Sequence, residues 1–249
     1  MFKKIQRYVT RVWLVIMNQA YVYDKKQHEN MQHHWGQCAE DVIVTSLLRD
    51  VHYNGFYVDV GAHHPTSISN TYWFYRLGWR GINIDASKES IDEFNTYRPR
   101  DTNLHMGVSN SSEKMEFHRF ESSVFNTFDA EMAKTWQSYS NKLESRYVQC
   151  NPLSTILAEY VPVGTDIDLL TIDVEGMELV VINSSDWERF RPKVVVVEQL
   201  ERSSILAQCQ SALHKVLERH GYTCVAIAGH SQYFLRADVF SHYLTIETA

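Results

Sequence analysis

The sequence predicts an α/β fold built around a mostly parallel β-sheet, with helices on both faces and an antiparallel strand pair at the C-terminus. Short apolar runs alternate with helical patterns along the chain, and this alternation is typical of parallel sheets. Two runs, DLLTIDV at 168–174 and KVVVVE at 193–198, are almost continuously apolar. Strands of this kind suit central positions in a sheet that is covered on both faces.

The individual elements follow from periodicity and from the residues that end each segment. Gly78 and Gly221 end two of the helices, Pro99 follows a third, and Pro152 precedes a fourth. Partial alternation of polar and apolar residues at 113–128 indicates a hairpin excursion. In chain order, the predicted elements are helix 39–50, strand 56–60, helix 69–77, strand 81–84, helix 87–97, strand 103–108, excursion 113–128, helix 153–160, strands 168–174 and 193–198, helix 205–220, and strands 223–228 and 232–235.

Two regions are predicted: an N-terminal helix and linker at 1–34, and one domain at 35–249 with an inserted excursion around 110–150. The N-terminal segment combines a basic face with an apolar stretch at 12–17 that is too short to span a bilayer. It fits either a packing helix with a solvated basic face or a peripheral membrane contact through residues 1–20.

The length, net charge and cysteine content of the chain narrow the class of protein. The chain has 249 residues and a formal net charge of −6, and it has no long basic run, which argues against a nucleic-acid partner. Its four cysteines form no C-x-x-C pair, as expected of reduced thiols in a cytoplasmic protein. Peripheral attachment at the inner face of the membrane is the alternative location.

Acidic residues end four of the predicted strands. These residues are Asp59, Asp85, Asp173 and Glu198. In open α/β sheets, ligands bind beyond the carboxyl ends of the strands. Four acids at equivalent strand ends therefore predict a shared polar rim that faces a ligand.

The turn after the first strand points to a nucleoside ligand. Gly61 allows a close backbone approach, and Asp85 follows at about the interval expected of an acid that binds ribose hydroxyls. A dinucleotide site favours G-x-G-x-x-G, whereas this chain has DVGAHHP. Two missing glycines weaken a nicotinamide site and favour a cofactor without phosphates, such as S-adenosylmethionine.

Several motifs in this order resemble the FkbM family of S-adenosylmethionine-dependent methyltransferases. They are WGQCAED, YVDVGAHHP, SNTYWFYRLGWRGINIDAS, RPRDTNLHMGVS, ESSVFNTFD, DLLTIDVEGMELVVI and RPKVVVVE, and they extend over about residues 35–200. The resemblance implies a class I methyltransferase (Rossmann-like) fold and methyl transfer to a hydroxyl. Many members have D-V-G-A-N-x-G where this chain has His63 and Pro65.

The resemblance also implies roles for individual residues. Asp59, Gly61 and Ala62 are expected at the methionine part of the cofactor, and Asp85 at the ribose. Ala86 and residues 106–108, including Gly107 and Val108, are expected near the adenine. Gln37 in the upstream motif and Asp173 are assigned to the cofactor site as well, and Asp173 and Glu175 are expected to face the reacting centre.

Methyl transfer to a sugar hydroxyl needs a group that removes the hydroxyl proton. Asp173 is the leading candidate base, because it ends a buried strand on the ligand side. Glu175 is the second candidate, with capping of the next helix as its alternative role. His63 could serve as a base, and His64 could orient the acceptor. A divalent ion held by Asp173, Glu175 or Glu198 ranks below a simple base.

The excursion is where acceptor specificity is expected, since loops vary while the sheet holds the cofactor. Ser123, Asn126 and Thr127 are the candidate acceptor residues there. Its aromatic side chains either stack on a sugar or close the core. The predicted activity is O-methylation of a sugar, glycan or glycolipid, with a sugar- or lipid-linked glycan as partner. The alternatives are an NAD(P)-dependent oxidoreductase and a catalytically degenerate binding protein.

Overall fold

The computed structural model describes residues 34–52, 54–199 and 204–245. The chain divides into two units, Met1–His34 and Trp35–Ala249, and the account below concerns the second. The predicted N-terminal helix and the predicted membrane contact through residues 1–20 lie outside the described residues. Within the described ranges, no helix combines the length and the apolar character that crossing a membrane requires.

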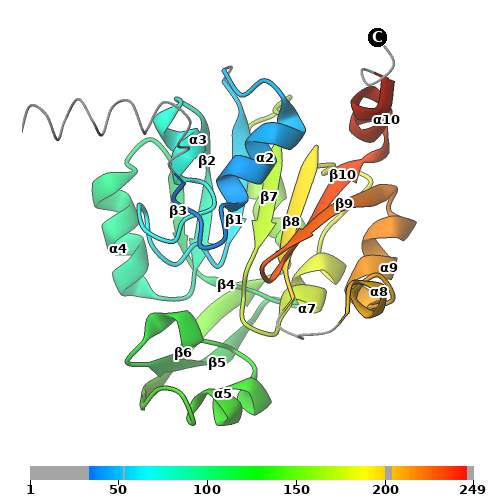
Figure 1. Ribbon diagram of the computed structural model, residues 1–249. Helices are drawn as coiled ribbons and strands as arrows, with labels where there is room; N and C mark the ends of the chain where they lie inside the picture. The colour runs from blue at the N-terminus through cyan, green and yellow to red at the C-terminus, as the bar shows by residue number, and fades with distance from the viewer. Residues whose placement is uncertain (1–33, 53, 200–203, 246–249) are drawn as a thin grey trace, which may run out of the picture. The chain divides into compact units, whose positions relative to one another are not determined.

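A seven-stranded sheet forms the centre of this unit (Figure 1). Its strand order is β3-β2-β1-β7-β8-β10-β9, with β10 antiparallel to both of its neighbours and the other pairs parallel. The strands are β1 Phe56–Val60, β2 Arg80–Asp85, β3 Thr102–His105, β7 Leu169–Ile172, β8 Val194–Glu198, β9 Tyr222–Ala228 and β10 Ser231–Arg236. The predicted fold class, a mostly parallel sheet with an antiparallel C-terminal pair, is confirmed.

Helices cover both faces of the sheet. One face packs on α6, α7 and α9 around Val58, Ile84 and Ile172, and the other packs on α2 and α3 around Tyr57 and Val196. The helices are α2 Glu40–Leu48, α3 Tyr72–Arg76, α4 Lys88–Tyr97, α5 Ala130–Trp136, α6 Leu153–Tyr160, α7 Glu178–Asn183, α8 Ile205–Gln208, α9 Ala212–Arg219 and α10 Ala237–Thr245. Because side chains alternate along a strand, each strand contributes to both apolar layers.

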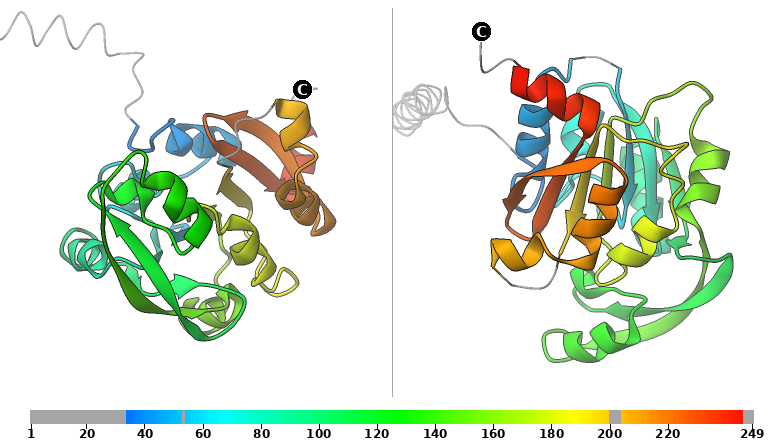
Figure 2. Two further views of the ribbon diagram at one scale, coloured as in Figure 1. Left: turned by 90° about the horizontal axis from the view of Figure 1, so that it is seen from below. Right: turned by 90° about the vertical axis from the view of Figure 1, so that its right-hand side faces the viewer.

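The excursion forms a second, three-stranded sheet at one end of the main sheet (Figures 1 and 2). Its order is β4-β6-β5, with β4 at Gly107–Val108, β5 at Glu113–Phe120 and β6 at Lys142–Asn151. A 3₁₀ helix, η2 at Ser123–Phe125, and α5 lie between β5 and β6. The hairpin strand that pairs with β5 is therefore β6, and it lies beyond the predicted 113–128 segment.

Two predicted elements are wrong as single units. Residues 103–108 form β3 in the main sheet and β4 in the second sheet, because the chain leaves the main sheet at Met106. Residues 205–220 form α8 and α9, since Ser211 caps a new helix by accepting a hydrogen bond from the His214 amide. The predicted helix at 69–77 is also shorter, and begins at Tyr72.

Candidate active site

A cleft of about 410 Å³ lies at the carboxyl ends of the parallel strands. The main sheet supplies Asp59, Gly61, Asp85, Asp173 and Glu198 to its lining. The second sheet and its connecting loop supply the opposite wall, with Phe117, Arg119, Phe120, Ser123 and Phe128. The volume lies within the range typical of small-molecule sites.

Strand register explains why the four predicted acids meet. Val60 pairs with Ile84 and with Ile172, and Ile172 pairs with Val197. Continuing each pairing by one residue gives a row in which Gly61 lies between Asp85 and Asp173, with Glu198 next to Asp173. Side chains at equivalent positions of parallel strands point to the same face. Asp59 lies one row deeper on that face, where it pairs with Thr171 and Asn83.

Asp85 receives two backbone hydrogen bonds at the end of β2. The His63 amide donates to Oδ2 at 2.8 Å, and the Ser87 amide donates to Oδ1 at 2.7 Å. Burial raises the pKa of Asp85 to about 6, and the two amide hydrogen bonds oppose that shift. Each carboxylate oxygen has a second lone pair, so Asp85 can still accept hydrogen bonds from a ligand.

Gly61 has a structural role that its sequence position did not reveal. Its φ angle is +79°, and a Cβ atom there would lie 1.7 Å from the carbonyl oxygen of Asp173. The glycine thus lets the end of β1 pass directly beside the end of β7, which brings Asp85 and Asp173 to opposite sides of one turn.

Gly61→Ala is expected to lower the free energy of unfolding because the new methyl group collides with backbone. Gly78→Ala is the matched control, since Gly78 also has a positive φ (+100°) but nothing within 4 Å of an added Cβ. We expect Gly61→Ala to cost about 1–3 kcal/mol more than Gly78→Ala in chemical denaturation. Equal costs for the two variants would show that the close approach to Asp173 is not constraining.

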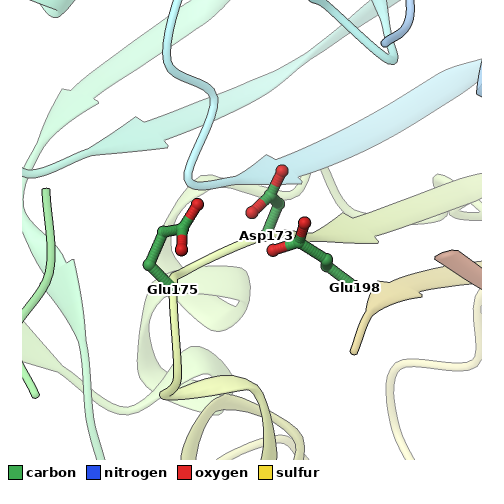
Figure 3. A group of neighbouring side chains, drawn as sticks. All are labelled: Asp173, Glu175 and Glu198. Atoms are coloured by element: carbon green, nitrogen blue, oxygen red, sulfur yellow. The ribbon is translucent and has the colours of Figure 1, made fainter. Parts of the chain in front are cut away.

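Asp173, Glu175 and Glu198 form a compact carboxylate cluster (Figure 3). One oxygen atom from each lies within 4.8 Å of one oxygen of each other residue. Glu175 Oε2 and Glu198 Oε2 are buried and have no hydrogen-bond partner among the described residues. Such a group could hold a proton or a hard cation.

Burial and mutual repulsion set the protonation of this cluster. Burial, followed by the negative charge of Glu198, raises the pKa of Asp173 well above its usual value. Burial likewise raises the pKa of Glu198 to about 7 and that of Glu175 to about 8. Two close carboxylates disfavour double ionisation, so burial and mutual repulsion together favour one shared proton on the Asp173–Glu198 pair. An ionised carboxylate of this pair is a stronger base than an ordinary carboxylate.

The turn that carries Glu175 is held by two residues that the sequence did not single out for this role. Glu178 accepts hydrogen bonds from the amides of Val174 (3.2 Å) and Gly176 (3.0 Å). Thr127, which is predicted to contact the methyl-acceptor substrate, donates a hydrogen bond from its hydroxyl to the Glu175 carbonyl oxygen at 2.7 Å. Glu175 itself has a left-handed backbone (φ 52°). The turn amides are therefore satisfied by Glu178, and the Glu175 carboxylate remains directed to the cluster.

The two histidines after Gly61 differ in their surroundings. His63 has Nε2 2.9 Å from Ser123 Oγ, while its Nδ1 is buried without a partner among the described residues. Burial lowers the pKa of His63, which favours the neutral ring. His64 Nδ1 accepts from the amides of Thr66 and Ser67, so His64 organises its own loop.

The remaining predicted residues line the same cleft in different ways. Gln37 is exposed at its edge, and Ala86, Gly107 and Val108 are buried in its wall. A Cβ on Gly107 would lie 2.6 Å from Cys150 Sγ and from the Phe128 ring, so this glycine serves packing. The Asn126 side chain accepts from the Phe120 amide at 2.9 Å and shapes the loop.

The aromatic residues of the excursion divide between its core and the cleft. The ring centroid of Trp136 lies 5.0 Å from that of Phe125 and 5.7 Å from that of Tyr139, so these three rings pack on one another. Phe120 and Phe128 line the cleft instead. Phe125, Trp136 and Tyr139 therefore close the core of the excursion, whereas Phe120 and Phe128 remain the candidates for contact with a sugar.

Comparisons with known proteins give a family and a set of distant structural likenesses. The model of the methyltransferase FkbM domain matches residues 59–224. None of the curated proteins matches the sequence.

The solved structures with a similar fold have a sequence identity of about 10% to this chain. A TehB-like SAM-dependent methyltransferase from Corynebacterium glutamicum is 10% identical over 88% of this chain and 97% of its own, with a TM-score of 0.41. An O-methyltransferase from Bacillus cereus in complex with SAH is 11% identical over 87% and 90%, with a TM-score of 0.40. Monomeric WbdD is 11% identical over 86% of this chain and 44% of its own, with a TM-score of 0.45. Since the family model covers more than half of the chain, this protein belongs to the FkbM family of methyltransferases.

Proposed function

We propose that the protein transfers the methyl group of S-adenosylmethionine to a hydroxyl group of a sugar, glycan or glycolipid. One observation carries the proposal. Asp85, the candidate ribose acid, and the Asp173–Glu198 pair lie in a single row across the sheet, on opposite sides of Gly61. A nucleoside and a reacting hydroxyl can thus be bound side by side.

The residues present fit this cofactor. Asp85 keeps free lone pairs for ribose hydroxyls, and Asp59 Oδ1 has no hydrogen-bond partner among the described residues. A carboxylate in that position suits the ammonium group of an amino-acid moiety. Buried Ala86 and Val108 offer an apolar surface for a base.

The bound cofactor would supply an electrophilic methyl group on a sulfonium centre. Once ionised, Asp173 would accept the proton of the acceptor hydroxyl, and its raised pKa would make it a stronger base than an ordinary carboxylate. Glu198 would accept a hydrogen bond from the protonated Asp173 and so stabilise the protonated form. Phe120 and Phe128 would exclude water and present apolar faces to the sugar ring.

The test of the cofactor assignment is calorimetric titration with S-adenosylhomocysteine, NAD and NADP. We expect selective binding of S-adenosylhomocysteine, weakened about tenfold or more in Asp85→Asn, because hydrogen bonds to a charged group are lost. Asp85→Asn keeps the shape of the side chain and one of the two amide hydrogen bonds, whereas Asp85→Ala would leave both the His63 and the Ser87 amide without an acceptor.

Ser87→Ala is the matched control. Ser87 caps α4 by accepting from the Ser90 amide, so its loss should cost about 1 kcal/mol of stability. Affinity for S-adenosylhomocysteine should stay unchanged in that variant. Tighter binding of NAD would support the oxidoreductase, and failure of all three ligands would support a binding protein without this cofactor.

A further inference from the structure

A buried polar network lies directly beneath the cleft, and its central residue is Arg98. The Arg98 side chain is 0% exposed. Its Nε donates to Asp101 Oδ2 at 2.9 Å, and its Nη2 donates to the Tyr57 hydroxyl at 2.6 Å. The guanidinium also lies 5.0–5.2 Å from the ring centroids of Phe94, Tyr57 and Tyr75. This packing leaves the guanidinium no freedom to reorient.

Thr71 connects this guanidinium to the cleft. Arg98 Nη1 and Nη2 each donate to Thr71 Oγ1 at 3.0 Å, and Thr71 Oγ1 donates to Asp59 Oδ2 at 2.6 Å. A hydroxyl has one proton and two lone pairs. Because Arg98 occupies both lone pairs, the hydroxyl proton can only be directed at Asp59.

The direction of these hydrogen bonds fixes the orientation of the Asp59 carboxylate. Oδ2 must remain an acceptor, and the other oxygen, Oδ1, has no hydrogen-bond partner among the described residues, although Asp59 lines the cleft. Only 4% of Asp59 is exposed. The carboxylate is therefore held in one orientation in which Oδ1 makes no hydrogen bond to the described residues and can bind a ligand.

The charges of the network are not balanced. One guanidinium serves two carboxylates, Asp101 directly and Asp59 through Thr71. One negative charge is left over, and Asp59 is the member that lines the cleft. Burial raises the pKa of Asp59 to about 6, and the Thr71 hydrogen bond and the Arg98 charge both lower it. The other charged groups that act on Asp59 are Asp101, Asp85 and Asp173.

We propose that Thr71 is a positioning residue of the cofactor site, which holds Asp59 ionised and aimed so that its free oxygen binds the ammonium group of an amino-acid-bearing nucleoside. This inference rests on the proposed function, because Thr71 would act through Asp59 on the amino-acid end of that ligand. It also gives a role to the RPRD segment at 98–101, which no catalytic or binding assignment explains.

The test compares two ligands that differ only in the part Asp59 would bind. S-adenosylhomocysteine carries the amino acid, and 5′-methylthioadenosine carries the same nucleoside without it. Thr71→Val removes the hydroxyl at nearly constant volume. We expect this variant to bind S-adenosylhomocysteine about tenfold or more weakly at pH 7, since a hydrogen bond to a charged group is lost. Its affinity for 5′-methylthioadenosine should stay unchanged.

Two further variants separate positioning from a general structural effect. Thr71→Ser keeps the hydroxyl and should retain wild-type affinity for both ligands. Asp59→Asn keeps the shape and loses the charge, so it should repeat the selective loss even if Thr71→Val does not fold. In Thr71→Val the pKa of Asp59 should rise, so the deficit should shrink as the pH is raised from 7 to 9.

The outcomes are distinguishable. If the wild-type protein binds neither ligand, the proposed function fails. If the wild type binds S-adenosylhomocysteine and both Thr71→Val and Asp59→Asn bind it equally well, only the role of Thr71 and Asp59 is overturned. Equal losses for both ligands would also overturn it, because the effect would then not depend on the amino-acid end.

Discussion

Replacing Asp173 by asparagine is expected to lower kcat about 100-fold or more while cofactor binding is retained, because positioned general bases contribute about 10²–10⁴-fold. Asparagine keeps the size of the side chain, so the close contact between Gly61 and the Asp173 backbone is preserved. It cannot accept the hydroxyl proton. The measurement is methyl transfer to a glycan acceptor, with calorimetry of S-adenosylhomocysteine on the same preparation.

The pH dependence of the wild-type reaction provides a second readout. A base works only when it is unprotonated, so the rate should rise with pH as the Asp173–Glu198 pair goes from two protons to one and then to none. Burial and the mutual charge raise the pKa of Asp173, and the pKa of Glu198 lies at about 7. The rate should therefore fall as the pH is lowered through about 7, and Asp173→Asn should abolish that dependence.

Glu198→Gln is the informative partner of this variant. It removes the charge that, after burial, raises the pKa of Asp173, so the pKa of Asp173 should fall and the rate profile should move to lower pH. Full activity of Asp173→Asn, or a pH profile that neither variant changes, would contradict the role of this pair in proton removal.

Replacing Arg98 by methionine is expected to lower the free energy of unfolding by about 3–5 kcal/mol, the usual cost of removing one partner of a buried ion pair. Methionine retains an unbranched apolar stem, so the change is mainly the loss of charge and hydrogen bonds. Asp101 would then be buried without its cation, and the hydroxyls of Tyr57 and Thr71 would lose their donors. For a domain of this size the melting temperature should drop by on the order of 10 °C.

Arg100→Met is the matched control, two residues along the chain. Arg100 is exposed, and its guanidinium lies 4.0 Å from the Tyr75 ring centroid. An exposed cation–π contact contributes about 0.5–1 kcal/mol, so this variant should change stability little. Similar stabilities of Arg98→Met and Arg100→Met would show that the buried network does not stabilise the fold.

The sequence by itself determined the main sheet and the composition of the ligand-facing rim. Apolar strands ending in Asp59, Asp85, Asp173 and Glu198 could be recognised because burial on both faces requires continuous apolar runs. Parallel pairing then brings the ends of such strands to one edge, whatever the loops between them do. The acids and the turn at Gly61 were therefore predictable from local pattern.

Tertiary structure alone decided which side chains share a contact across long separations. The split of 103–108 between two sheets depends on pairing with β6, more than forty residues away, and nothing local marks it. The network of Arg98, Thr71 and Asp59 likewise joins three segments, and an isolated arginine before a proline gives no sign that it will be buried. No local pattern singles out Glu178, yet it holds the turn beside the carboxylate cluster. Strand register and helix packing set these contacts, since burial and hydrogen bonding of a polar side chain depend on what the rest of the chain places around it.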